Sequence, residues 1–171
     1  MRCTMPESNT PINNNLPEFQ GEIEINQQVD ATFDSCAVKQ VITSILTDHG
    51  YRDGLISIAI VDDPTIHRLN IEYLQHDYAT DVLSFTLNSD PHRHWLEGEV
   101  IVSNDTAKKM SQVYQWTPWA ELILYIIHGT LHLVGMEDHT EALKKQMQVE
   151  ETKYLLSLGL ERSAPLENEA Q

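Results

Sequence analysis

The chain has 171 residues, 41% hydrophobic and 22% charged, which suits one compact domain with a hydrophobic core. Its longest uninterrupted apolar run, Leu122 to Ile127, is far shorter than the roughly 20 residues that a membrane-spanning helix needs. The net charge is −15 and no segment is rich in Lys or Arg, which argues against a surface coated with phosphate-binding groups.

The two ends of the chain differ from its middle. Residues 1–20 have little hydrophobic periodicity and lack the apolar segment of a signal peptide. We expect a flexible N-terminal segment (1–20), one folded domain (21–159) and a flexible C-terminal tail (160–171). With only Cys3 and Cys36 available, no structural disulfide is expected. These features favour a cytoplasmic protein that does not associate with a membrane.

The first half of the chain alternates between strand and helix patterns. The alternation in residues 22–26 predicts a strand, and apolar side chains at helical spacing predict a helix over residues 35–49, before Gly50. Residues 55–61 predict a second strand. Asp63 and Pro64 are typical of a helix start, since proline suits the first turn.

Helices dominate the second half of the chain. Short strands are predicted at residues 82–85 and 98–102, followed by a helix over about residues 104–114. Thr117 and Pro118 then begin a helix that is apolar nearly all round and stops at Gly135, so we expect it to be buried. A last helix follows over about residues 140–158. This order predicts an α+β fold in which one layer of helices packs on a small mixed sheet.

Two histidines, His128 and His132, lie four residues apart on the predicted buried helix. Residues at this spacing share one helix face, so both imidazoles can reach one metal ion. The glycine between them, Gly129, is unfavourable inside a helix and suggests that another segment approaches the backbone there. The alternative is a pair of core histidines that simply have their hydrogen bonds satisfied.

Two further metal-binding side chains, Asp138 and His139, follow the glycine stop. Either can supply a third ligand, which leaves the fourth position of a zinc ion open, as in catalytic sites. The zinc-peptidase motif His-Glu-x-x-His carries its general base after the first histidine, but Gly129 occupies that place here. Proteolysis is therefore disfavoured, and Asp138, Glu137 or the substrate phosphate remain as candidate bases.

Three blocks of the sequence stand out as motifs. The first is His-Gly-Thr-Leu-His-Leu-Val-Gly at 128–135, followed by Asp138 and His139. The second combines Leu-Asn-Ile-Glu-Tyr at 69–73 with Thr-Asp-Val-Leu-Ser-Phe at 80–85. The third is Gly-Glu-Val-Ile-Val-Ser at 98–103. In order and spacing these blocks resemble the YbeY endoribonuclease family of bacterial rRNA maturation factors, and the resemblance covers about residues 22–158.

This resemblance implies a fold and a function. The fold is a four-stranded mixed sheet with about five helices, one of them a zincin-like helix that carries the metal histidines. The function is zinc-dependent, single-strand-specific endoribonuclease activity in rRNA maturation, including the 3′ end of small-subunit rRNA, and in ribosome biogenesis. One zinc ion per chain, single-stranded RNA and the small ribosomal subunit or its proteins are the implied cofactor and partners.

The chain departs from the family pattern at the third ligand. The family's third histidine lies ten residues after the first, where this chain has Asp138, and a histidine follows only at position 139. We interpret this as one extra residue in the turn and predict that His139 is the third ligand beside His128 and His132. Asp138 is the alternative ligand and otherwise a candidate catalytic residue.

A second departure concerns phosphate binding. The family usually has an arginine after the tyrosine of its second block, where this chain has Leu74; Arg68 or His76 could take its place. Ser84 is a candidate catalytic residue, while Asp81 can either line the cleft or satisfy backbone groups at a strand entry. The missing arginine keeps a rival hypothesis open, namely a non-catalytic, zinc-containing ribosome-assembly factor that acts through protein partners.

Overall fold

The computed structural model describes residues 17–161, so most of the two terminal segments predicted to be flexible lies outside the described residues. The strands are β1 (Glu22–Gln27), β2 (Asp53–Val61), β3 (Val82–Asp90) and β4 (Trp95–Ser103). The helices are α1 (Ser35–Asp48), α2 (Asp63–Leu74), α3 (Asn104–Val113), α4 (Pro118–Leu133) and α5 (Glu141–Ser157). The α+β class with a four-stranded sheet and five helices is confirmed. In the described part of the chain, no helix combines the length and apolar character needed to cross a bilayer.

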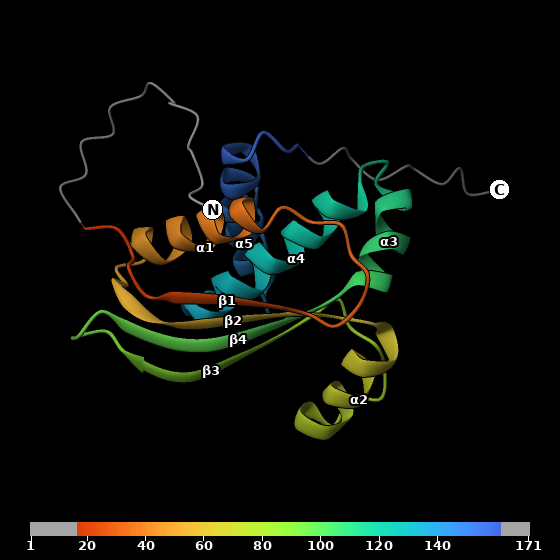
Figure 1. Ribbon diagram of the computed structural model, residues 1–171, viewed down its shortest axis with the longest axis horizontal. Helices are drawn as coiled ribbons and strands as arrows, with labels where there is room; N and C mark the ends of the chain where they lie inside the picture. The colour runs from red at the N-terminus through yellow and green to blue at the C-terminus, as the bar shows by residue number, and fades with distance from the viewer. Residues whose placement is uncertain (1–16, 162–171) are drawn as a thin grey trace.

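The sheet is mixed, with the strand order β1-β2-β4-β3 (Figure 1). Strands β1, β2 and β4 are parallel to one another, whereas β3 runs antiparallel to β4 at the edge. The parallel pairs are connected through helices, because a parallel crossover needs a long connection. The register places Val82 opposite Val102, so β3 begins beside the end of β4.

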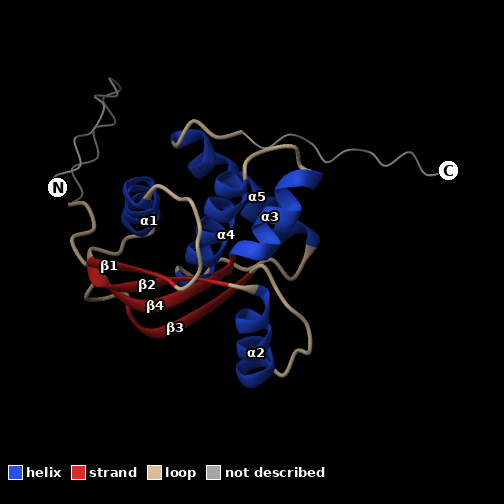
Figure 2. Cartoon of the chain, turned by 45° about the vertical axis from the view of Figure 1, so that its right-hand side comes forward, coloured by secondary structure: helices blue, strands red, loops and turns tan. Residues whose placement is uncertain are grey.

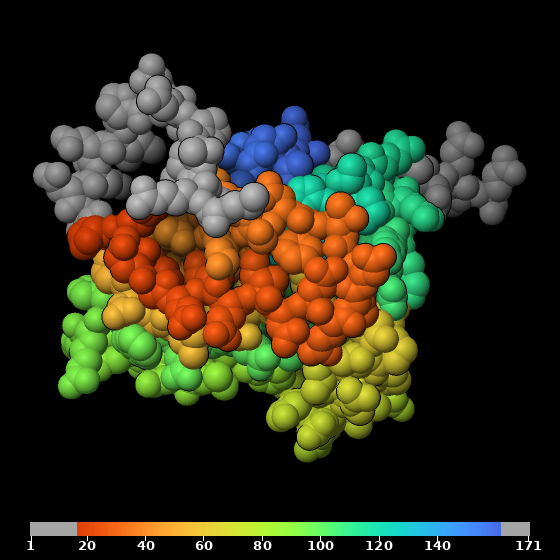
Figure 3. Space-filling model, in the orientation of Figure 1, coloured from red at the N-terminus to blue at the C-terminus, as the bar shows by residue number. Residues whose placement is uncertain are grey.

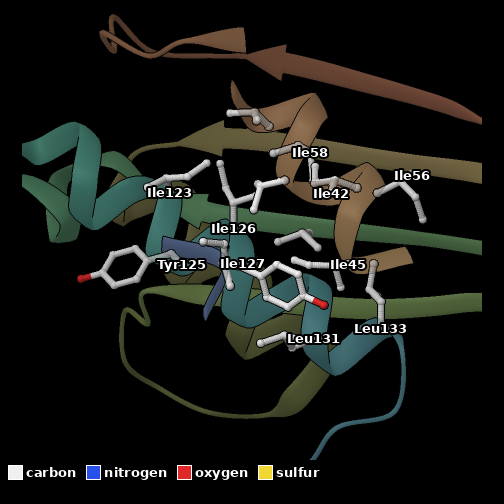
Figure 4. Packing of buried hydrophobic residues seen from close by; sticks show 14 of the residues in the cluster. Ile42, Ile45, Ile56, Ile58, Ile123, Tyr125, Ile126, Ile127, Leu131 and Leu133 are labelled. Atoms are coloured by element: carbon white, nitrogen blue, oxygen red, sulfur yellow. The ribbon is translucent and has the colours of Figure 1, made fainter. Parts of the chain in front are cut away.

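Most helices cover one face of the sheet, and α4 lies at the centre of that layer (Figure 1). Alternate residues of β2, such as Ile56 and Ile58, face this layer and are fully buried. Ile126 of α4 and Ile42 of α1 meet them in the main hydrophobic core (Figure 4). The nearly continuous apolar sequence of α4 is explained by this position, since neighbouring elements surround it.

Helix α2 lies on the opposite face of the sheet, so the expectation of a single helical layer is wrong on this point (Figure 2). Ile66 packs there against Val61, Leu83 and Ile101, which point away from the main core. The helix projects from the rest of the molecule in the space-filling view (Figure 3). Its apolar stripe is narrow, and the sequence pattern does not say which face of the sheet such a stripe will cover.

The ends of α4 fix the position of the histidine segment. The side chain of Thr117 accepts a hydrogen bond from the backbone N–H of Ala120 at 3.1 Å, and Pro118 occupies the first turn, as the sequence predicts. Gly135 follows the helix with a φ of 94°, a left-handed conformation that favours glycine. The chain can therefore reverse immediately after His132.

Candidate metal centre

The imidazoles of His128 and His132 meet on one face of α4, as their spacing predicts. Their Nε2 atoms are 2.9 Å apart, and the two rings are arranged edge to face at a centroid distance of 4.5 Å. The side chains are 23% and 28% exposed, so both rings are largely buried but can still be reached from solvent.

The other ring nitrogen of each histidine is occupied by an oxygen acceptor. His132 Nδ1 donates to the carbonyl oxygen of Met136 at 2.9 Å, and His128 Nδ1 donates to Glu151 Oε1 at 2.6 Å. A carbonyl and a carboxylate can only accept, so both Nδ1 atoms carry a proton. The Nε2 atoms are thereby left as the positions available for a metal ion or a shared proton.

Asp138 completes a group of three potential ligands. Its Oδ2 lies 3.8 Å from His128 Nε2, and its Oδ1 lies 3.9 Å from His132 Nε2. Ligand atoms of all three side chains lie within 4.8 Å of one another. The turn at Gly135 brings the Asp138 carboxylate back over the end of α4, beside the histidine pair.

The surrounding charges act on His128. Burial by itself lowers the pKa of His128, but the hydrogen bond and the charge of Glu151 outweigh it. The carboxylates of Asp81 and Asp138 add to this effect. The pKa of His128 is therefore raised above its ordinary value, and the site attracts positive charge.

His139, the predicted third ligand, lies outside this group. Its side chain is 67% exposed, and its Nδ1 lies 3.3 Å from Glu137 Oε2. The geometry thus favours Asp138, the alternative ligand, which stands ten residues after His128 without any need for an extra residue in the turn. Metal binding by His139 remains a prediction that requires its side chain to turn away from Glu137.

Ser84 and Gly129, both singled out in the sequence, lie in the contact between the sheet and α4. Ser84 Oγ of β3 donates to the carbonyl oxygen of Gly129 at 3.0 Å. A Cβ atom added at Gly129 would lie 2.5 Å from Val100 Cγ1 and 2.9 Å from Ser84 Oγ. The close approach predicted at Gly129 is therefore real, and the hydroxyl of Ser84 serves this packing in the structure.

Sequence reasoning missed Glu151, which orients His128 from α5. It lies 23 residues after its partner, next to a second glutamate on the same helix, so nothing in the sequence distinguishes it. Its side chain is only 15% exposed, a sign that could be found only once the packing of α5 on α4 was known.

A pocket of about 440 Å³ adjoins the centre and shares His128 with it. Asp81 lines this pocket, while its Oδ1 also accepts a hydrogen bond from the backbone of Val82, so both roles considered for Asp81 are present. Leu74 is 46% exposed at the end of α2 and does not line the pocket. Arg68 and His76 do not line it either; His76 contacts Tyr78, a lining residue, by ring stacking and a 3.5 Å hydrogen bond between Nδ1 and the hydroxyl.

The donor set fits a zinc ion. Two imidazole nitrogens and one carboxylate oxygen are the ligands of several catalytic zinc sites, in which a fourth position stays open. Two nitrogens bound tetrahedrally to one zinc ion at 2.0–2.1 Å lie roughly 3.3 Å apart, close to the 2.9 Å between the histidine Nε2 atoms. Oxygen acceptors on both Nδ1 atoms are the usual second layer of such a site.

The fold and this site define an α+β protein with a helix-borne group suited to bind a metal ion. A family model described as "Endoribonuclease YbeY" matches residues 20–159. The chain belongs to the YbeY endoribonuclease family, and the resemblance found in the sequence is confirmed.

Curated relatives support this assignment, and each of the following is named "Endoribonuclease YbeY". One from Rhodopirellula baltica is 39% identical over 118 residues, which is 68% of this chain and 59% of that relative. One from Chloroherpeton thalassium is 37% identical, covering 71% of this chain and 84% of the relative. One from Salinibacter ruber is 34% identical, covering 81% and 93%.

A solved structure supports the fold. The solution structure of a Thermotoga maritima protein aligns with a TM-score of 0.56 over 81% of this chain and 92% of that one. Because the two sequences are only 22% identical, this likeness concerns the architecture alone.

Proposed function

We propose that the chain is a zinc-dependent endoribonuclease that cleaves single-stranded RNA. The observation that carries the proposal is the His128–His132–Asp138 group on the buried helix of a YbeY family fold. His128, His132 and Asp138 would hold one zinc ion per chain. When bound there, a zinc ion supplies Lewis acidity at neutral pH, which suits phosphodiester cleavage.

The residues around the ligands have separate tasks in this proposal. Glu151 and the Met136 carbonyl hold the imidazoles in the orientation that presents Nε2. With Asp138 as a ligand, the proton of the attacking oxygen needs a different acceptor. We assign this role to Asp81, which lines the adjoining pocket and is fixed by the backbone N–H of Val82 at 2.9 Å.

The assignment of Asp81 has a direct test. Replacing Asp81 with Asn keeps the size of the side chain but removes the proton acceptor, so cleavage should slow by about 10²–10⁴-fold. Zinc content, measured by mass spectrometry on the same preparation, should stay at the wild-type level. Unchanged cleavage by this variant would remove Asp81 from the reaction.

The proposal extends to the biological substrate. We propose precursor rRNA, including the 3′ end of the small-subunit rRNA, as the RNA that is cut, and the small ribosomal subunit or its proteins as partners. Support comes from family membership. Such an enzyme would work in the cytoplasm, where ribosomes are assembled.

Labelled single-stranded RNA tests the central activity. The purified zinc-loaded chain should cleave it, and His132→Ala should abolish cleavage because one ligand is lost. The matched control is His139→Ala, which changes a nearby exposed histidine and should leave cleavage intact. Cleavage that survives in His132→Ala would contradict the proposed site.

A second candidate function is a non-catalytic assembly factor that keeps the zinc ion. Leu74 at the usual arginine position favours it, and so does the absence of Lys and Arg among the described residues that line the pocket. This function would be supported by intact RNA in the cleavage assay together with tight binding of small-subunit proteins to the zinc-loaded chain.

A further inference from the structure

The pocket beside the candidate metal centre is bounded by four parts of the chain. The loop after α2 contributes Tyr78 and Asp81, α3 contributes Met110, and α4 contributes His128. Helix α5 contributes Glu151. A volume of about 440 Å³ is within the range of pockets that hold small organic ligands. Because His128 borders both places, an RNA strand whose phosphate lies at the metal centre can extend into this pocket.

Aromatic side chains line the pocket on several sides. Tyr114 follows α3, Tyr125 comes from α4, and Tyr78 stands at the rim with 57% of its surface exposed. The ring of Tyr78 lies nearly parallel to that of His76, at an interplanar angle of 11° and a centroid distance of 5.5 Å. An exposed ring held in one orientation offers a surface on which a flat ligand can stack.

The charged side chains of the pocket disfavour a phosphate. Asp81, Glu121 and Glu151 line it, whereas the described lining includes neither Lys nor Arg. All three carboxylates repel a phosphate. Asp81 is assigned to the attacking oxygen, and Glu121 is only 1% exposed. Glu151, whose Oε1 accepts from His128, is therefore the carboxylate placed to accept a further hydrogen bond from an amino group on a base edge. The pocket therefore suits the uncharged part of a nucleotide.

We propose that this pocket binds a nucleobase next to the scissile phosphate, stacked on Tyr78, and that it prefers a base with an exocyclic amino group. The inference rests on the proposed function and adds to it a specificity determinant. It also explains how a strand can be positioned although Leu74 replaces the usual arginine, since base stacking takes over part of the binding.

An uncleavable oligonucleotide tests the proposal on the zinc-loaded chain. The probe is a single-stranded tetranucleotide with 2′-O-methyl riboses and one 2-aminopurine, a fluorescent base whose emission falls when it stacks on an aromatic ring. The wild-type chain should quench it. Tyr78→Ala should weaken binding on the order of 5- to 100-fold, and Tyr78→Phe should bind like the wild type.

The chain offers a matched control in Tyr73. It is also an exposed tyrosine on the α2 side, at 60% exposure, but it packs against Phe85 and does not line the pocket. Tyr73→Ala should bind the probe like the wild type. Equal affinity of Tyr78→Ala and the wild type, or equal affinity for an abasic tetranucleotide, would overturn the proposal.

Base preference tests the part of the proposal that concerns the carboxylates. Oligocytidylate should bind more tightly than oligouridylate of the same length, because cytosine carries an amino group where uracil carries a carbonyl. Equal affinity for the two would overturn this part.

Cleavage of the unmodified tetranucleotide, measured in parallel, separates this inference from the proposed function. Cleavage by the wild type together with unaltered binding by Tyr78→Ala would retain the nuclease and remove the base pocket. Binding that depends on Tyr78, without cleavage by the wild type, would retain the base pocket and remove the nuclease.

Discussion

At the scale of single residues, the candidate metal centre depends on the hydrogen bonds that the Nδ1 atoms of the two histidines donate. Glu151 Oε1 lies 2.6 Å from His128 Nδ1, in a position where only 15% of the Glu151 side chain is exposed. A carboxylate in this role orients the ring and increases its basicity, and both effects strengthen metal binding.

Neutralising Glu151 should therefore weaken the metal site without removing a ligand. We expect Glu151→Gln to lower zinc affinity by about 10-fold or more, measured by competition with a chromogenic chelator. The matched control is Glu150→Gln, which changes the neighbouring carboxylate that pairs with Lys153 at 3.2 Å. Equal losses in both variants would point to a general charge effect instead of a specific hydrogen bond.

At the scale of elements, the packing of β3 and β4 on α4 depends on a missing side chain at Gly129. Gly129→Ala would gain about 0.8–1.0 kcal/mol of helix propensity, but its methyl group would lie 2.5 Å from Val100 Cγ1. Overpacking of this kind costs roughly 1–3 kcal/mol, so we expect a net loss of stability in urea denaturation.

A double variant checks that the cause is this contact. Val100→Ala removes the side chain that the new methyl group would meet, although it leaves a cavity of its own. The Gly129→Ala/Val100→Ala chain should be more stable than the sum of the two single losses predicts. If the stability losses of the two single variants simply add in the double variant, the loss in Gly129→Ala does not come from the contact with Val100.

Asp63, in the first turn of α2, forms hydrogen bonds that connect this helix with α3 on the other side of the sheet. Its carboxylate accepts hydrogen bonds from Ser103, Thr106 and Lys109. Burial by itself raises the pKa of Asp63, but these three donors outweigh it and lower the pKa to about 2. The carboxylate therefore stabilises the fold above its unfolded-state pKa of 3.8, and this contribution is lost as the pH falls towards 2.

This linkage predicts how Asp63→Asn behaves with pH. At pH 6 the variant should be less stable than the wild type by about 1.5–3 kcal/mol, the range for hydrogen bonds to a charged group. By pH 3 the deficit should have fallen to roughly half, because part of the wild-type contribution is already lost. Urea denaturation of both proteins at the two pH values measures this stability deficit. A deficit that grows on acidification would contradict the stabilising role of the Asp63 carboxylate.

At the scale of the whole molecule, much of the fold could be predicted because local signals mark its elements. Thr117 and Pro118 fix the start of α4 and Gly135 its end, and the histidine spacing then places both imidazoles on one face. The side of the sheet covered by α2 could not be predicted, because the chain that leaves the end of β2 can turn towards either face of the sheet. The choice between Asp138 and His139 depends on backbone angles after Gly135, which composition and spacing do not determine.

Metal binding should also stabilise the molecule, because the candidate ligands lie on α4 and on the loop that leads to α5, and α5 supplies Glu151. At free zinc about 100-fold above the dissociation constant, the stabilisation is about 2.7 kcal/mol, or roughly 5–10 °C in melting temperature for a chain of this size. Differential scanning calorimetry with and without chelator should show this shift. His132→Ala should show none, and a shift of equal size in that variant would place the bound metal elsewhere.

The most direct test of the account counts metal ions. Native mass spectrometry on the wild type, Asp138→Ala and His139→Ala, purified identically without added chelator, gives the zinc content per chain. We expect one zinc ion in the wild type and in His139→Ala, and a clear loss in Asp138→Ala. Full occupancy in Asp138→Ala together with loss in His139→Ala would contradict the site described here.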